Sequence, residues 1–233
     1  MRDYCDGDAV PLTVPFFFRR KQTSRYRNDN AFSPDWTWRF RAYKYLFDKT
    51  LAVLGLVVAS QFGGLLLFLH PFLNPGPLFY RQERYGKDKK SFVMWKFRTM
   101  LPEDPGQQRG ATCGLETGRI TILGAALRKY RIDELPNFLN VLLGQMSVIG
   151  PRPDIASHAC HYCQEISHYN YRFKIKPGIT GLAQIESGYA EGIEATARKA
   201  HFDRIYVQSS CTRMDAYIAL RTIGVMISGF GAK

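Results

Sequence analysis

One uncharged apolar stretch constrains the fold of this chain more than any other feature. It runs from Leu51 to Leu69, which is about the length that an α-helix needs to cross the hydrocarbon core of a bilayer. Basic residues flank it on both sides: Arg39, Arg41, Lys44 and Lys49 precede it, and Arg81, Arg84, Lys87, Lys89 and Lys90 follow it. Because basic flanks favour the cytoplasmic side, the pattern predicts a helix that enters the membrane and returns.

The middle of this stretch suggests where such a helix would break. Ser60-Gln61 and Gly63-Gly64 place polar groups and two weak helix formers at mid-depth in the bilayer. Two alternatives remain, which are a helix that crosses the membrane once and a buried helix of a soluble domain.

The composition indicates the class of partner. The 233 residues carry a net charge of +12 and are 45% hydrophobic, so the chain can bury a core and attract nucleic acid, acidic phospholipid or a phosphorylated substrate. No helix-turn-helix, RNA-stacking motif or zinc finger accompanies the charge, and we expect no nucleic-acid partner. Five cysteines without the spacing of a disulfide scaffold favour a reducing compartment. Residues of the types that bind zinc also cluster, without the second half of a structural zinc motif, at His158, Cys160, His161 and Cys163.

The order of motifs predicts an α+β fold that is mostly helical with a short β-hairpin, in a monotopic membrane protein. We expect a basic, mostly irregular arm at residues 1–40, a membrane-inserted and re-entrant helix at 41–75, and a cytoplasmic domain at 76–233. Within that domain the patterns predict a hairpin around Gly86, with strands at 78–80 and 91–95, and a loop at 101–118. Helices are predicted at 122–130, 136–143 and 155–172, a tight loop at 176–181, and a last apolar segment at 214–227 that lies along an interface or in the core.

Asp133 and Glu134 are the strongest candidates for chemistry. They are adjacent carboxylates in a basic run that includes Arg128 and Arg131, at what reads as a helix start. Aspartate is also a common N-cap, so the pair alone is weak support for catalysis. A carboxylate beside two arginines is expected to stay ionised and to act as a nucleophile or a metal ligand.

Other basic residues could neutralise a phosphate. Lys96 and Arg98 end the second predicted strand, and Arg128 precedes the carboxylates by one to two helical turns. Arg152 lies between Pro151 and Pro153, and the two prolines lower the entropy lost when its guanidinium holds an oxyanion. Phosphoryl transfer needs such cations together with a metal and a positioned nucleophile.

The ordered series of motifs from Tyr43 to Ala232 resembles the bacterial sugar transferases, which are monotopic phosphoglycosyl transferases that start glycan assembly on polyprenyl phosphate. The resemblance is to the small type that initiates exopolysaccharides. Its motifs are Phe47-Asp48, Pro75-Gly76-Pro77, Gln82 to Gly86, Lys96 to Met100, Leu127-Arg128, Asp133 to Pro136, Asn140-Val141, Met146-Ser147, Gly150 to Pro153 and Lys176 to Gln184.

The resemblance implies a covalent exchange in two steps. Asp133 would attack the sugar-linked phosphorus of a UDP-sugar, release UMP and hold a phosphosugar, galactose or glucose phosphate, until undecaprenyl phosphate accepts it. Glu134 would bind Mg²⁺. The remaining substrate contacts would come from Lys96, Arg98, Arg128, Arg152, Pro153, Lys176 and Thr180.

The resemblance also implies a location and partners. The chain would lie at the bacterial inner membrane, in contact with membrane lipid, with its catalytic domain on the cytoplasmic face and with downstream glycosyltransferases as further partners. Two positions depart from the family, since Gln61 follows Ser60 where proline is common, and Ile185-Glu186 follows Gln184 where Gly-Arg is common. The alternative function is a membrane-anchored interaction protein without catalysis.

Overall fold

The computed structural model describes residues 34, 36–101, 117–187 and 192–228. Nearly all of the predicted basic arm and most of the predicted loop at 101–118 lie outside these residues.

Helix α1, Trp38–Leu73, is the longest element, with 36 residues. It begins where the Thr37 hydroxyl accepts a hydrogen bond from the Phe40 N–H, and it ends at Asn74 before the Pro75-Gly76-Pro77 turn. The predicted break at residues 60–64 is wrong, because the helix continues through it. The Ser60 hydroxyl donates to the Val57 carbonyl of its own helix, and Gly63 faces the ring of Phe97. These polar and small residues therefore serve the helix and its packing.

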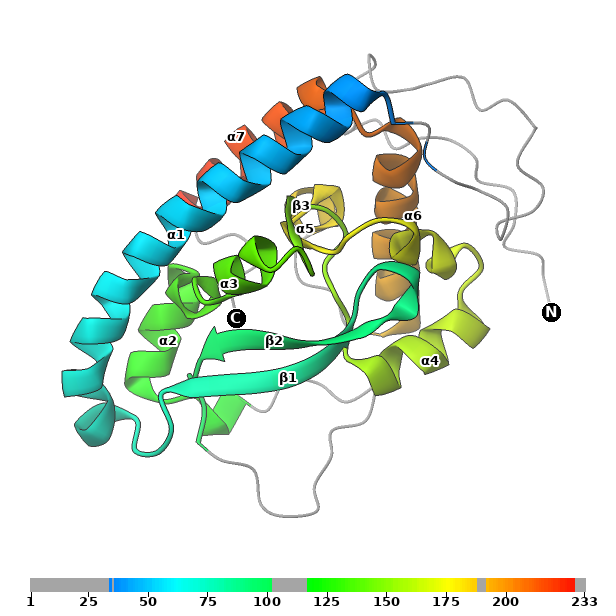
Figure 1. The fold of residues 1–233 in the computed structure, drawn as a ribbon. Coiled ribbons are helices and arrows are strands. Elements are labelled where there is room, and N and C mark those ends of the chain that lie inside the picture. The colour runs from blue at the N-terminus through cyan, green and yellow to red at the C-terminus, as the bar shows by residue number, and fades with distance from the viewer. Residues whose placement is uncertain (1–33, 35, 102–116, 188–191, 229–233) are drawn as a thin grey trace.

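One face of α1 packs along the rest of the protein for the whole length of the helix (Figure 1). The buried residues recur at helical spacing and are Phe40, Lys44, Asp48, Ala52, Ala59, Leu66 and His70. Gly55 permits the closest approach, since a Cβ at this position would overlap the ring of Phe138. The opposite face exposes large apolar side chains, among them Val53, Leu54, Val57, Leu65 and Phe68. By length and composition α1 is the one described helix that could cross a membrane, but here it lies against the domain.

The predicted β-hairpin is confirmed. Strands β1, Phe79–Tyr85, and β2, Ser91–Phe97, are antiparallel, with Phe79 opposite Phe97 and Tyr85 opposite Ser91. A 3₁₀ turn at Lys87–Lys89 connects them. Both strands are longer than predicted, and β1 contacts α4 while β2 contacts α3.

A second pair of strands was not predicted. Strand β3, Ser147–Ile149, runs parallel to β4, Gly178–Thr180, so the tight loop expected at 176–181 is wrong in part. Three residues are too few to show the alternation that identifies a strand in a sequence. The two glycines Gly150 and Gly178 allow the backbones to meet, because a Cβ on Gly178 would overlap the backbone of Gly150.

Helices surround these two small sheets (Figure 1). Their bounds are Ile122–Lys129 for α2, Asn137–Leu142 for α3, Ala156–Glu165 for α4, Leu182–Ser187 for α5, Ile193–Ser209 for α6 and Thr212–Ser228 for α7. The helix predicted at 155–172 is shorter than expected. The chain turns at His168, where φ is 65°, and continues as a 3₁₀ helix at Tyr169–Lys174. The mostly helical α+β class is confirmed.

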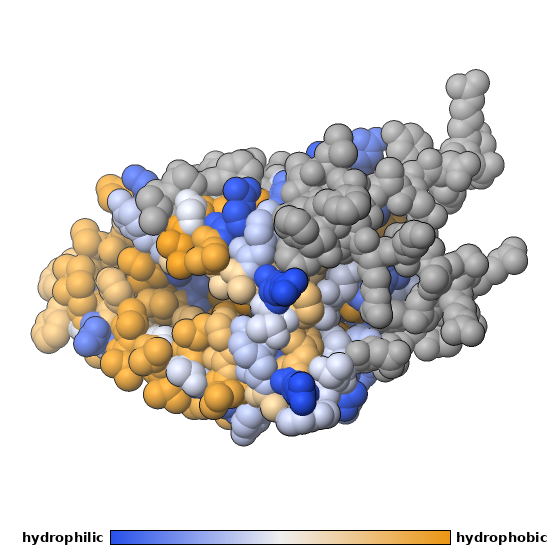
Figure 2. Space-filling view, turned by 90° about the horizontal axis from the view of Figure 1, so that it is seen from above, coloured by the Kyte–Doolittle hydropathy of each residue, from blue (hydrophilic) through white to orange (hydrophobic). Residues whose placement is uncertain are grey.

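The last apolar segment was predicted to lie along an interface or in the core, and helix α7 does both. Met214 and Ile218 are fully buried in the main core, while Leu220 and Ile223 are exposed. Helix α7 contacts α1, and Figure 2 views the molecule from the side on which both helices lie. Apolar surface covers much of this face, which is unusual for a surface that meets only water.

Candidate active site

Asp133 and Glu134 lie in a short 3₁₀ turn, Ile132–Glu134, between α2 and α3. The turn follows Arg131, which adopts a left-handed conformation with φ of 58° that side chains other than glycine seldom take. The expected N-cap role of Asp133 is wrong, because α3 begins after Pro136 and has no side-chain cap. The two carboxylates are instead presented by the sharp turn itself.

Glu134 is buried and fully surrounded by cations. Its Oε1 lies 2.8 Å from Lys96 Nζ and accepts a hydrogen bond from Arg152 Nη2, and its Oε2 lies 3.3 Å from Arg152 Nη1. Arg131 approaches to 3.9 Å. Burial alone would raise the pKa of Glu134, but Arg152 and Lys96 outweigh it and hold that pKa well below its usual range. Glu134 is therefore an ionised anchor for two cations.

Asp133 is equally buried, with 7% of its surface exposed, but it is paired differently. Its Oδ1 is buried and accepts no hydrogen bond from the described residues. Burial raises the pKa of Asp133, and the adjacent Glu134 charge adds to this, while Lys96, Arg152 and Arg128 oppose it. The neighbouring arginines therefore lower this pKa as expected, but burial outweighs them and the net shift is upward. A buried carboxylate oxygen without a donor usually signals a functional role or a missing ligand.

Packing of α2 against Thr99, which follows β2, and of α3 against β2 positions two of the cations. Arg128 Nε donates to Thr99 Oγ1 at 2.9 Å, and α2 reaches this close because Gly124 meets the Thr99 carbonyl, where a Cβ would not fit. Asn140 of α3 donates to the Val93 carbonyl at 2.7 Å and accepts from the Trp95 N–H at 3.3 Å. This amide fixes the strand just before Lys96, which is half-buried beside Glu134.

The Gly150 to Asp154 turn presents Arg152 and is held by its backbone. The Pro151 carbonyl accepts from the Gly178 N–H at 2.8 Å, and the Arg152 carbonyl accepts from Arg172 Nη2 at 2.8 Å. Arg84 Nη1 donates to the Pro153 carbonyl at 3.1 Å. Pro153 was expected to contact the substrate. In the structure it stiffens the turn, and its carbonyl accepts the hydrogen bond from Arg84.

Sequence reasoning assigned no role to Arg84 or Arg172. Arg84 belongs to the Gln82 to Gly86 motif, which was a usable signal, and its burial beside Arg152 lowers its pKa to about 10. Arg172 gave no signal, since its partners come from two segments that are distant from it in the sequence. It pairs with Asp154, whose other contact is the Tyr169 hydroxyl, and its Nη2 lies 3.1 Å from Asp203 Oδ2.

Comparison with known proteins now assigns the family. Residues 39–229 match the family described as bacterial sugar transferase. The chain belongs to this family. The prediction made from the motifs is confirmed.

Three relatives illustrate the range of the family. The chain is 40% identical to a UDP-N-acetylgalactosamine-undecaprenyl-phosphate N-acetylgalactosaminephosphotransferase of Aeromonas hydrophila, over 81% of this chain and 46% of that protein. It is 38% identical to the UDP-glucose:undecaprenyl-phosphate glucose-1-phosphate transferase of Escherichia coli K12, over 78% of this chain and 40% of that protein. The exopolysaccharide production protein ExoY of Rhizobium meliloti is 34% identical, over 87% and 95%. The chain thus spans less than half of the first two relatives and nearly all of the third.

Three family-motif residues that were expected at the site lie elsewhere. Arg98 donates to the carbonyls of Asn74 and Pro75 and so closes the turn after α1. The Thr180 hydroxyl is 2.8 Å from the Thr222 hydroxyl on α7. Lys176 lines a separate cavity at the other end of α3. The substrate-binding role predicted for these three residues is not supported by their positions.

The fit of a magnesium ion is partial. Among the described residues no group of three or more histidines, cysteines, aspartates or glutamates could hold a metal. Magnesium is commonly held by one or two carboxylates together with water and substrate phosphates. Asp133 Oδ1 has an oxygen available for this, whereas both Glu134 oxygens are already engaged by Arg152.

Proposed function

We propose that this chain transfers a hexose 1-phosphate from a UDP-sugar to undecaprenyl phosphate and releases UMP. The names of two relatives state such transfers, with N-acetylgalactosamine and with glucose. The observation that carries the proposal is the buried Asp133 Oδ1, which accepts no hydrogen bond from the part of the chain that the structure describes and lies among cations. We expect glucose or galactose as the sugar, and the lipid product would start an exopolysaccharide that downstream glycosyltransferases extend.

The reaction would proceed through a phosphosugar on Asp133. A carboxylate oxygen of Asp133 forms a bond to the sugar-linked phosphorus, and the bond from that phosphorus to the bridging oxygen breaks, so that UMP leaves with the oxygen. An oxygen of undecaprenyl phosphate then attacks the same phosphorus and releases the Asp133 carboxylate. Each step exchanges one phosphate linkage for another, and two easier transfers replace one difficult transfer.

The cations would act on the developing charge. Arg128 and Lys96 both favour the anionic form of Asp133, and the same groups can contact the phosphate oxygens as the new bond forms. Arg152 is fixed by Glu134 and by its own rigid turn, so little entropy is lost when it binds an oxyanion. The proposed role of Glu134 is first to orient Arg152 and Lys96.

Magnesium is proposed as a cofactor that arrives with the diphosphate of the donor. Asp133 Oδ1 is the carboxylate oxygen that would hold it, because Arg152 engages both Glu134 oxygens, and the sugar-nucleotide phosphates would supply further oxygens. The metal would neutralise phosphate charge. Removal of magnesium with EDTA should abolish UMP release, and addition of magnesium should restore it; full activity in EDTA would remove the cofactor from the proposal.

We also propose that the apolar face of α1 and α7 rests in the headgroup region of the inner membrane. Because α1 packs along the domain over its whole length, the helix cannot cross the bilayer without taking the domain with it. The basic residues on both flanks of the apolar stretch would then stay on the cytoplasmic side. This arrangement would place a lipid acceptor and a soluble donor at the same site.

The placement is tested by thiol labelling. Single cysteines replace Thr50 and Ser91, one on each flank, in a chain whose own cysteines have been changed to serine. With an impermeant reagent, labelling of both positions only after the inner membrane is opened supports the placement. Labelling of one position in intact cells would show a crossing helix.

The transfer is tested with purified chain, magnesium, undecaprenyl phosphate and a panel of radiolabelled UDP-hexoses. We expect labelled lipid with one sugar, and without acceptor we expect UMP release that stops near one equivalent of protein. The trapped adduct should be cleaved by hydroxylamine, as acyl phosphates are, and should map to the peptide that contains Asp133. If no sugar yields labelled lipid, the chain is better described as a membrane-anchored interaction protein.

A further inference from the structure

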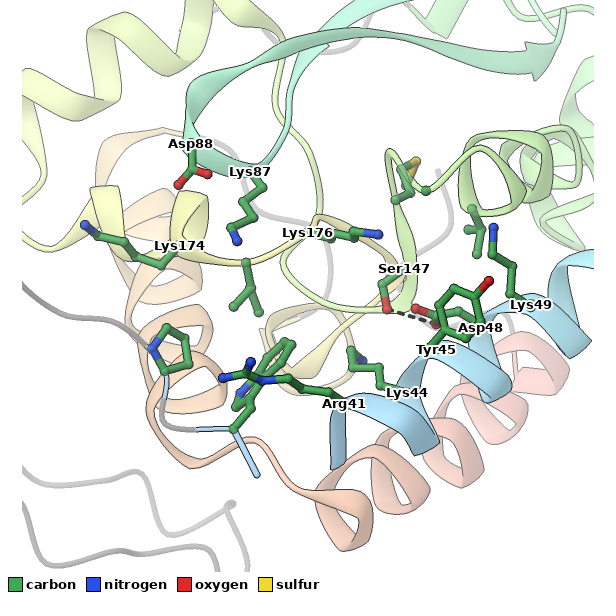
Figure 3. A pocket seen from close by; sticks show the side chains of 16 residues that line it. Arg41, Lys44, Tyr45, Asp48, Lys49, Lys87, Asp88, Ser147, Lys174 and Lys176 are labelled. Atoms are coloured by element: carbon green, nitrogen blue, oxygen red, sulfur yellow. Dashed lines mark hydrogen bonds between the residues drawn. The ribbon is translucent and has the colours of Figure 1, made fainter. Parts of the chain in front are cut away.

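The structure contains a second cationic cavity, with a volume of about 670 Å³. It lies between the first turns of α1, the hairpin turn, the residues before β3 and the segment that leads into β4. Figure 3 shows its side chains. Basic residues outnumber acidic ones in its lining, with Arg41, Lys44, Lys49, Lys87, Lys174 and Lys176 against Asp48 and Asp88.

This cavity is separate from the Asp133 site. The turn that carries Asp133 precedes α3, whereas Val141 and Gly144, which line the cavity, lie at and after the end of α3. A six-residue helix is about 9 Å long at a rise of 1.5 Å per residue. None of the residues that pair with Glu134 lines the cavity. A ligand here would not be the phosphate that is transferred.

Part of the charge in the cavity is already neutralised. Asp48 accepts hydrogen bonds from the Ser147 hydroxyl at 3.0 Å and the Val148 N–H at 2.9 Å. Lys44 forms an ion pair with Asp215 at 3.0 Å, and Lys49 donates to the Leu142 carbonyl. These contacts engage Lys44 and Lys49 within the protein and leave the other cations of the lining to define the potential of the cavity.

Three exposed cations remain around the space, namely Arg41, Lys87 and Lys176. In Figure 3 the ammonium of Lys87 points from the hairpin turn toward the cavity, Arg41 extends beneath it from α1, and Lys176 extends toward Ser147. Partial burial lowers the pKa of Lys176, Asp48 opposes this, and the like charges of Lys49 and Lys87 lower it further. A bound anion would relieve this repulsion.

We propose that this cavity binds a phosphate group between Arg41, Lys87 and Lys176, carried either by an acidic lipid headgroup or by a soluble phosphate. The lipid source is favoured by position. Tyr45 lines the cavity and is 66% exposed, and the neighbouring Leu46, 68% exposed, begins the apolar outer face of α1. The cavity thus opens beside the surface that would meet the bilayer. Phosphate binding does not depend on transferase activity.

The test compares the thermal unfolding midpoint of the full chain under three conditions. These are neutral detergent alone, the same detergent with inorganic phosphate at ionic strength matched with chloride, and mixed micelles that contain phosphatidylglycerol. Variant Lys87→Gln/Lys176→Gln removes two cavity charges. The control Lys90→Gln/Arg198→Gln removes two exposed charges outside the cavity.

We expect a ligand to raise the midpoint of the wild type and the control by about 2–4 °C, and to raise that of the cavity variant by much less. The ligand concentration for half of the shift should rise roughly tenfold in the cavity variant, since each lysine contributes about one charge contact. A shift with phosphatidylglycerol alone identifies a headgroup site, and a shift with inorganic phosphate as well identifies a general phosphate site. No shift with either ligand, or an equal shift in both double variants, would overturn the proposal.

The outcome is independent of the proposed transfer reaction. Asp133→Asn should keep the ligand-dependent shift, because Asp133 does not line the cavity. If the transfer assay fails with every sugar, the midpoint comparison still decides whether the cavity binds phosphate. The single variant Lys87→Gln, at an exposed turn, guards against misfolding of the double variant and should lose part of the shift.

Discussion

Two of the places where the described residues bury charge, around Asp133 and Glu134 and around Lys44 and Asp215, pair that charge differently. Lys44 Nζ has three acceptors, which are Asp215 Oδ2 at 3.0 Å, the Ile149 carbonyl at 2.9 Å and the Tyr206 hydroxyl at 3.2 Å. The Tyr206 hydroxyl donates to the other Asp215 oxygen at 2.7 Å. An ammonium has three N–H groups, so this junction is fully satisfied.

The Asp133 site is left incomplete in the same protein. Glu134 is saturated by cations, while its neighbour keeps one buried oxygen without a donor. The Lys44 junction ties α1 to β3, α6 and α7, so its completeness serves the fold. The open oxygen of Asp133 costs stability and would be retained for chemistry. The difference predicts opposite responses to mutation.

The largest expected effect is on activity, from Asp133→Asn. Turnover should fall roughly a thousandfold or more, because the amide cannot act as the nucleophile. The thermal midpoint should stay or rise, since a buried negative charge that burial disfavours is removed. UMP release and thermal unfolding are measured on the same preparation. Wild-type turnover by the variant would remove Asp133 as the nucleophile.

The Lys44 junction should behave in the opposite way. Asp215→Ala leaves the Lys44 ammonium buried without its anion and should lower the free energy of unfolding by about 3–5 kcal/mol. The double variant Lys44→Met/Asp215→Leu should recover much of this loss, because both charges are gone. Denaturant unfolding of the wild type, Lys44→Met, Asp215→Leu and the double variant gives the coupling. If the double variant is as unstable as Asp215→Ala, the ion pair is not the cause.

A smaller effect is expected from Arg152→Ala, which removes a cation from the incomplete site. Turnover should fall about a hundredfold, the usual loss when one charge-stabilising donor is removed. Arg152→Lys should recover only part of it, since lysine cannot contact both Glu134 oxygens at once. The matched control is Thr180→Val, a position that the motif pattern favoured and that contacts Thr222 instead. Its activity should stay within about twofold of the wild type, and a loss as large as that of Arg152→Ala would return Thr180 to the site.

These contrasts also show how far the sequence could be read. Lys96, Arg128 and Arg152 were chosen because phosphate chemistry needs cations near a carboxylate, and the structure brings them to Asp133 and Glu134. Arg98 was chosen by the same argument but binds backbone carbonyls, because a cation in a motif can serve either purpose. The contacts of Arg172 span separate segments, which a linear pattern does not reveal.

The fold was predicted to a similar degree. Long periodic segments and the hairpin were recovered because their patterns extend over many residues. The β3–β4 pair was missed because each strand has only three residues. Such strands are too short to show an alternation of apolar and polar residues in the sequence. The break expected in α1 depended on Ser60 and two glycines, but the Ser60 hydroxyl bonds within the helix, Gly63 faces the ring of Phe97, and a Cβ on Gly64 would meet open space.

A moderate effect is expected in the pH profile of the transfer. Because burial raises the pKa of Asp133 and the anion is the proposed nucleophile, kcat/KM should rise with pH along a limb above the usual carboxylate range. Lys96→Met removes the largest charge that favours the anion, so the limb should move to higher pH. Initial rates from pH 5 to 9 measure both profiles. Superimposable limbs would show that another group controls the rate.

The smallest effect concerns Asp203. It pairs with Arg172, which holds the Arg152 turn, and it belongs neither to the Asp133 site nor to the Lys44 junction. Burial raises its pKa to about 7, and Asp154 adds to this, while Arg172 opposes it. The unfolded carboxyl titrates near 3.9, so between about pH 4 and 7 the folded chain holds more protons than the unfolded chain. The stability contributed by Asp203 is therefore fully present below pH 4 and is lost as the pH rises toward 7.

Asp203→Asn should flatten this decline in the thermal midpoint, and Glu194→Gln, at an exposed position in the first turn of the same helix, should leave it unchanged. Equal slopes in all three proteins would show that Asp203 does not titrate in this range. A flattened slope would show that Asp203 is intermediate between the two clusters in how completely its charge is paired. It forms an ion pair with Arg172 at 3.1 Å, but its Oδ2 accepts no hydrogen bond from the described residues. Unpaired carboxylate oxygens would then occur both at Asp133 and among the residues that hold Arg152. The Lys44–Asp215 junction would differ from both, because all of its hydrogen-bonding groups are paired.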